Sequence, residues 1–164
     1  MKFFVFLGFL GYYLVRATIN EVQRDDAMCR IDEVFPRDTV ILLDSTDSLN
    51  ESQFLSVKNY VEKNVLEPSI LDERFTVYVL NDQPDTFKFK PVVRVCRPRD
   101  GKNADPLTEN PRIIKRNWDE KFIEPLLGPF TDLRANQQAN SSPIMEMLKF
   151  VGHRTMTMSD APEK

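Results

Sequence analysis

The chain has 164 residues, of which 41% are hydrophobic and 29% are charged, and this balance predicts one globular domain with a terminal appendage. Its formal net charge is −3, and it contains no long basic run. Proteins that bind nucleic acid concentrate Lys and Arg on one face, so we do not expect a nucleic-acid partner.

An uncharged, mostly apolar run opens the chain from Phe3 to Val15, between Lys2 and Arg16. The run is shorter than the roughly 20 residues that span a bilayer as a helix, and it is typical of a signal peptide or a signal anchor. In an anchor, residues 16–19 extend the span while Arg16 reaches the interface. We therefore expect a hydrophobic membrane segment at residues 1–19, with the remainder outside the cytoplasm, periplasmic or extracellular. The alternative is a buried N-terminal helix of the domain.

Two cysteines, Cys29 and Cys96, lie outside any metal-binding spacing. In an exported protein such a pair indicates one disulfide, and two unrelated buried thiols are the alternative. Residues 20–37 are largely polar and charged, and we expect them to form a spacer between the membrane segment and a domain at residues 38–164.

The first element of that domain is a continuous β-branched and apolar run at residues 39–43. Such a run is typical of a strand covered on both faces, as in a parallel sheet. Asn50 with Gln53 three residues later forms a capping-box pattern, which predicts a helix that continues to about Leu66 and ends before Pro68.

Two further strands are predicted at residues 75–80 and 92–96, the second nearer an edge because Pro91 precedes it. A long polar loop is expected from Arg97 to Arg112. These strands and the helix before them indicate an α/β protein with an open sheet flanked by helices.

Two helices are predicted after the long loop. Asn117 with Glu120 repeats the capping-box pattern, and Pro125 is expected to end or kink the helix that it opens. Ser142 is the expected N-cap of a last helix, with Pro143 at its first position.

The strongest candidate for a functional site is the loop Asp44-Ser45-Thr46-Asp47-Ser48, directly after the first strand. Ligands of open parallel sheets bind at the carboxyl ends of the strands. Carboxylate and hydroxyl oxygens are hard donors of the kind that Mg²⁺ and Ca²⁺ prefer, so we expect Asp44, Thr46 and Ser48 to converge on a divalent cation. The structural alternative is that these side chains cap free backbone N–H groups.

The Asp-x-Thr-x-Ser pattern after a buried strand resembles the metal-ion-dependent adhesion site of von Willebrand factor type A domains, here of a bacterial, membrane-anchored type. The resemblance implies a Rossmann-like fold and a second ligand loop, for which Ser141 and Ser142 are the candidates. The family also uses an Asp after a later strand. Asp160 follows no apolar strand, so we expect a domain that is short at its C-terminal end and incomplete in its third ligand loop.

In that family hydroxyl ligands leave the cation electrophilic, and it then attracts a carboxylate of a partner protein. The resemblance therefore implies a non-enzymatic protein-interaction domain with Mg²⁺, or Ca²⁺ or Mn²⁺, as its cofactor.

Two alternatives remain. A metal-dependent phosphoryl hydrolase of the haloacid dehalogenase type also places an Asp after a buried strand, but its second Asp is replaced here by Thr46. A metal-free structural module would keep the fold and use Asp44 only to cap a turn.

Overall fold

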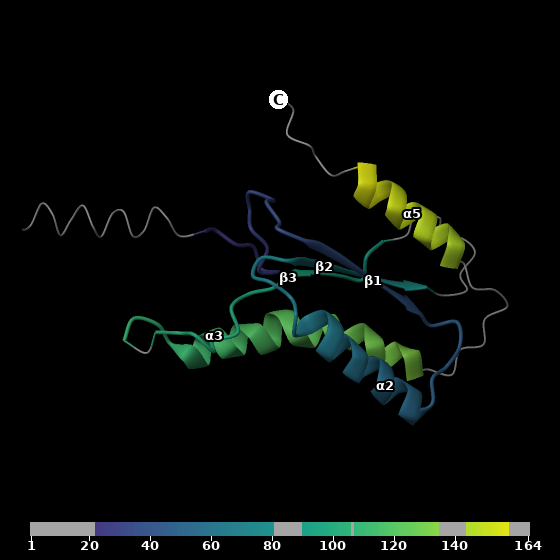
Figure 1. Ribbon diagram of the computed structural model, residues 1–164, viewed down its shortest axis with the longest axis horizontal. Coiled ribbons are helices and arrows are strands. Elements are labelled where there is room, and N and C mark those ends of the chain that lie inside the picture. The colour runs from purple at the N-terminus through teal and green to yellow at the C-terminus, as the bar shows by residue number, and fades with distance from the viewer. Residues whose placement is uncertain (1–21, 81–89, 106, 135–143, 158–164) are drawn as a thin grey trace, which may run out of the picture.

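The computed structural model describes residues 22–80, 90–105, 107–134 and 144–157. A three-stranded sheet lies between helices on its two faces (Figure 1), which confirms the predicted α/β class. The predicted hydrophobic segment at residues 1–19 lies outside the described residues. Within the described part of the chain, no helix is both long and apolar enough to cross a membrane.

The sheet has the strand order β1-β2-β3. Strands β1 (Asp38–Asp44) and β2 (Arg74–Leu80) are parallel, whereas β3 (Val93–Cys96) is antiparallel to β2. The three predicted strands are present, but the sheet is mixed and not fully parallel. The apolar run that was expected inside a parallel sheet forms β1, and β1 lies at an edge of the described sheet.

The crossover from β1 to β2 passes through α2 (Glu51–Val61), which continues as the π-helix η1 (Glu62–Leu66). The predicted capping box is confirmed. The Asn50 side chain accepts a hydrogen bond from the Gln53 amide at 3.0 Å, and the Gln53 side chain accepts one from the Asn50 amide at 3.0 Å. These reciprocal bonds satisfy two of the N–H groups that a helix start leaves without an intrahelical acceptor.

A second helical stretch comprises α3 (Pro111–Trp118), the π-helix η2 (Asp119–Ile123), α4 (Glu124–Leu127) and the 3₁₀ segment η3 (Gly128–Arg134). The prediction that Asn117 opens this helix is wrong. Asn110 is the N-cap, because its side chain accepts from the Arg112 amide at 3.1 Å. Pro125 does not end the helical path, since Ile123 and Glu124 before it and Gly128 after α4 all keep right-handed helical dihedral angles.

Most of the core lies between the sheet and the two helical stretches, α2 with η1 and α3 to η3. Phe75 of β2 meets Phe122 of η2 edge to face, with ring centroids 5.3 Å apart. Both side chains are fully buried, which removes their large apolar surfaces from water. The core on this face consists of Leu43, Val61, Leu66, Phe75, Val77, Val95, Phe122, Leu126, Phe130 and Leu133.

The last helix, α5 (Ile144–Thr157), covers the opposite face of the sheet. Its Phe150 meets Tyr78 of β2 at a centroid distance of 6.3 Å. One turn earlier, Met147 is buried in the same apolar cluster as Leu80, the last residue of β2. The N-terminal end of α5 therefore lies toward the carboxyl ends of β1 and β2 (Figure 1).

Candidate functional site

The loop after β1 brings two of the predicted metal ligands together. The Asp44 carboxylate accepts a hydrogen bond from the Thr46 amide at 3.0 Å and another from the Thr46 hydroxyl at 2.6 Å. Thr46 is buried, whereas Asp44 is partly exposed at the end of the strand. The contact forms because a short Asp side chain reaches the backbone N–H two residues later and folds the chain into a tight turn.

Ser45 fixes this turn to the neighbouring strand. Its hydroxyl donates to the Leu80 carbonyl at 2.6 Å, and its amide donates to the same oxygen at 3.1 Å. The buried Ser45 therefore has a structural role that we did not predict, although a hydroxyl directly after a strand was a signal for it. Asp47 and Ser48 are exposed, so Ser48 is not buried beside Thr46.

The second predicted ligand loop contains Ser141 and Ser142, which lie outside the described residues. The described residues that precede and follow this loop lie at the same end of the sheet as the Asp44 loop. The Leu133 carbonyl accepts from the Leu49 amide at 2.9 Å, just after the Asp44 loop. On the other side, Met147 near the start of α5 packs with Leu80. Both ends of the connecting segment thus lie near the carboxyl ends of β1 and β2.

The donor chemistry of the loop fits a hard cation. When the Thr46 hydroxyl donates its proton to Asp44, its oxygen lone pairs stay available to a metal, and the carboxylate supplies the negative charge. Within the described ranges, no group of three or more His, Cys, Asp or Glu side chains could hold a metal. Any cation at this loop would therefore depend on hydroxyl oxygens as well as on Asp44.

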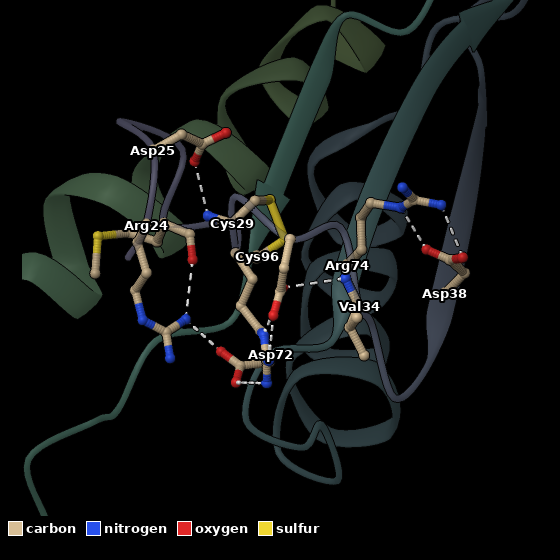
Figure 2. The surroundings of a disulfide bond; sticks show 11 residues. Arg24, Asp25, Cys29, Val34, Asp38, Asp72, Arg74 and Cys96 are labelled. Carbon is tan, nitrogen blue, oxygen red and sulfur yellow. Dashed lines mark hydrogen bonds and ion pairs between the residues drawn. A yellow bond between two sulfur atoms is a disulfide. The ribbon is translucent and has the colours of Figure 1, made fainter. Parts of the chain in front are cut away.

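The opposite end of the sheet carries a disulfide between Cys29 and Cys96 (Figure 2). Both cysteines are buried, at 6% and 0% exposure. The Cys96 amide donates to the Ala27 carbonyl at 3.0 Å, so the backbone beside the disulfide is also attached to the end of β3. The two cysteines of the predicted pair are therefore joined, and within the expected spacer Cys29 is buried and Ala27 packs against the core.

Ion pairs surround the disulfide. Arg24 pairs with Asp72, which precedes β2, and also donates to the Met28 carbonyl at 3.1 Å (Figure 2). The Asp25 carboxylate accepts from the Cys29 amide at 2.8 Å. We did not predict these contacts from the sequence, because a segment that mixes Arg and Asp is typical of a solvated spacer.

Glu73 is the most buried charged side chain described, at 1% exposure. Burial alone would raise its pKa, but hydrogen bonds from Arg37, from the Thr39 hydroxyl at 2.5 Å and from the Ile70 amide at 2.9 Å lower the pKa below its ordinary value. The group is thus held as a carboxylate at the start of the parallel strands, and its contacts with Arg37, Thr39 and Ile70 are structural.

A groove of about 650 Å³ runs between the loop around Asp100 and α3. Its walls carry both signs of charge, and several of these charges are already paired. Lys115 contacts Asp119 at 2.6 Å, and Lys102 contacts Asp100 at 3.7 Å. A groove with balanced, paired charges selects no particular ionic ligand, so the loop after β1 is the stronger candidate site.

No family model matches the chain, and neither a curated protein nor a solved structure matches it. The geometry of the Asp44 loop and of the disulfide therefore carries the functional interpretation.

Proposed function

We propose that this chain is an exported or membrane-tethered protein-interaction domain, in which a divalent cation at the loop after β1 contacts a carboxylate of a partner protein. The contact between the Asp44 carboxylate and the Thr46 hydroxyl, at the carboxyl end of a parallel strand, carries the proposal. Such an end is where open α/β sheets bind their ligands.

The export part of the proposal is supported by the Cys29–Cys96 disulfide. Disulfides form and persist in oxidising compartments, and they are rare where glutathione and thioredoxin keep thiols reduced. The apolar run from Phe3 to Val15 in the sequence supports the same location.

Asp44, Thr46 and Ser48 would supply the first ligand loop, and Ser141 and Ser142 the second, for Mg²⁺ or for Ca²⁺ or Mn²⁺. Because most of these ligands are neutral hydroxyls, they leave the cation with a net positive charge. That charge suits capture of an anionic side chain, and binding requires no chemical step. The likeness of the loop to the von Willebrand factor type A pattern supports the same interpretation.

A metal-free structural module is the second candidate, and one observation favours it. Asp44 already accepts from the Thr46 amide, and that bond alone would justify an Asp at the end of the strand. Asp44→Asn separates the two candidates, because an amide oxygen still accepts from the Thr46 amide while the negative charge is lost.

The experiment measures the melting temperature of the full chain with 10 mM Mg²⁺, Ca²⁺ or Mn²⁺ and with EDTA. If the cation binds the folded state with a Kd of about 1 mM, it adds roughly 1.4 kcal/mol, or about 3–6 °C. We expect this shift in the parent protein and in the control Ser56→Ala, an exposed helix position, and no shift in Asp44→Asn.

Two results would contradict the proposal. If no cation moves the melting temperature of the parent protein, the loop binds no metal and the metal-free module is correct. If Asp44→Asn keeps the full shift, the cation binds elsewhere on the chain.

A further inference from the structure

The segment of residues 22–34 contributes little to the hydrophobic core that it packs beside. Of its residues, all of which the structure describes, Cys29 alone is buried, and Ala27 is partly buried against the core. Most of the other side chains are exposed, including the apolar Ile31 and Val34 at 60% and 58%. Apolar burial is the main stabilising contribution in a folded protein, and this segment receives little of it.

Three polar contacts join segment 22–34 to the rest of the described chain, apart from the disulfide. The Cys96 amide donates to the Ala27 carbonyl at 3.0 Å. Arg24 and Arg30 both pair with Asp72, Arg30 at 3.9 Å (Figure 2). Partly exposed ion pairs contribute little, whereas fixing the backbone of each residue costs conformational entropy. These contacts are therefore too few to keep the segment ordered without the covalent bond.

The backbone of the segment is also strained at two positions. Met28 and Glu33 have φ angles of 63° and 54°, in the left-handed region that residues with a Cβ rarely adopt. Such conformations persist only where the surrounding structure imposes them. Detachment of the segment therefore relieves strain at the same time as it breaks the weak contacts.

We propose that the Cys29–Cys96 disulfide is a redox switch, whose reduction by a dithiol releases residues 22–34 while the sheet and its helices stay folded. The fold is preserved because the segment supplies none of the buried residues of the core cluster, and because β1 and β2 pair from Asp38 onward. Phe35 marks the end of the released part, since the Arg74 guanidinium lies 4.2 Å from the centroid of its ring.

The reduction is a thiol–disulfide exchange in two steps. A thiolate of the dithiol attacks the sulfur of Cys29, the more exposed of the two cysteines, and Cys96 leaves as a thiolate that takes up a proton. The second thiolate of the reductant then attacks the mixed disulfide, and Cys29 leaves and is protonated in turn. Two electrons and two protons pass to the protein, and the dithiol becomes a disulfide.

In the tethered protein proposed above, release of the segment lengthens the chain between the membrane and β1. Residues 16–21 separate the apolar run from the segment, and at about 3.4 Å per residue they span at most about 20 Å. After release, residues 16–34 span at most about 65 Å. The redox state then sets how far the Asp44 loop reaches from the membrane. This consequence rests on the proposed tether, whereas the switch itself does not.

The test follows amide hydrogen exchange of the full chain in a mild detergent by mass spectrometry, before and after treatment with 10 mM dithiothreitol. We expect reduction to raise exchange in residues 22–34 at least tenfold and in β1 and β2 less than threefold. Reoxidation with glutathione disulfide should restore the original pattern. The control, Cys29→Ser with Cys96→Ser, should show the released pattern with and without dithiothreitol. If this variant fails to fold, the response of the parent protein decides the question.

A second pair of variants tests whether the weak contacts limit access to the disulfide. Arg24→Gln removes the ion pair with Asp72, so the segment should open more often and be reduced at least threefold faster. The control Arg116→Gln removes an exposed pair with Glu120 at 3.9 Å in the second helical stretch and should leave the rate unchanged. Timed alkylation of the new thiols, followed by mass spectrometry, measures both rates.

Four outcomes would overturn the proposal. If the bond resists dithiothreitol in the folded protein, it is a permanent cross-link. Unchanged exchange in residues 22–34 after complete reduction would show that the other contacts hold the segment. Equal loss of protection in β1 and β2 would show that the disulfide maintains the whole fold. Equal reduction rates for Arg24→Gln and the parent protein would show that the ion pair with Asp72 does not hold the segment closed.

Discussion

The carboxylate of Glu73 pairs with the guanidinium of Arg37, 36 residues earlier in the chain, at the point where β1 and β2 both begin. The Thr39 hydroxyl binds the other carboxylate oxygen at 2.5 Å. One buried carboxylate therefore joins the starts of the two parallel strands. Loss of its charge should affect the pairing of β1 with β2 as well as the local ion pair.

The lowered pKa of Glu73 gives a prediction for acid stability. Because its pKa is lower in the folded than in the unfolded chain, Glu73 stabilises the fold above the unfolded pKa, and this contribution is lost as the pH falls through the folded pKa. We expect Glu73→Gln to cost about 1–3 kcal/mol near pH 7 and to flatten the decrease of stability below pH 4.5. Urea unfolding at several pH values measures both effects.

The control for Glu73 is Glu62→Gln, which removes a half-exposed ion pair with Lys58 at 3.9 Å. Pairs of this kind contribute less than about 1 kcal/mol, so this variant should unfold close to the parent protein at pH 7. Equal losses in the two variants would contradict the structural role assigned to Glu73.

Reduction of the disulfide gives a second prediction. Cys29 and Cys96 are separated by 67 residues, and for a loop of this length the chain-entropy model assigns about 4 kcal/mol to the cross-link. We expect Cys29→Ser with Cys96→Ser to lower the unfolding free energy by roughly 2–5 kcal/mol. The control is the double variant with reductant, which should unfold as it does without reductant, whereas the parent protein should lose stability when reduced.

Mass spectrometry of the alkylated protein, with and without prior reduction, checks that the bond forms in the purified chain. Free thiols at both positions in protein purified under oxidising conditions would disprove the pairing.

The two candidate caps of α3 give a third prediction. The Asn110 side chain accepts from the Arg112 and Ile113 amides, so Asn110→Ala should cost about 1 kcal/mol. Asn117→Ala lies inside the helix, where Ala has the higher helix propensity, and it should change stability by less than about 0.5 kcal/mol. The two variants are compared by urea unfolding at pH 7, and a larger loss at Asn117 would contradict a helix that begins after Asn110.

The elements predicted correctly from the sequence are those set by local patterns. The capping box of Asn50 and Gln53 depends on residues three apart, and the apolar runs of the strands are continuous in the sequence. The start of α3 was also a local signal, Asn110 followed by Pro111, but the Asn117–Glu120 pattern competes with it. Only the packed structure shows which of the two Asn side chains accepts the backbone N–H groups.

Features that depend on distant residues could not be predicted in this way. Nothing near β3 in the sequence determines that it runs antiparallel to β2, and this direction changes a parallel sheet into a mixed one. At the candidate site, the Asp44 side chain contacts Thr46 within a turn of three residues. Their spacing in the sequence predicts such a contact. The contact of Ser45 with Leu80 depends on the register between β1 and β2, which cannot be inferred from the sequence alone.

The disulfide also determines how the domain would carry mechanical load. Tension applied at Val22 reaches Cys29 and passes through the sulfur–sulfur bond directly into the end of β3 at Cys96. The residues between the two cysteines, which include β1 and β2, are bypassed and are not stretched. A pull between Val22 and the chain that follows Cys96 would therefore not extend the backbone that contains β1 and β2.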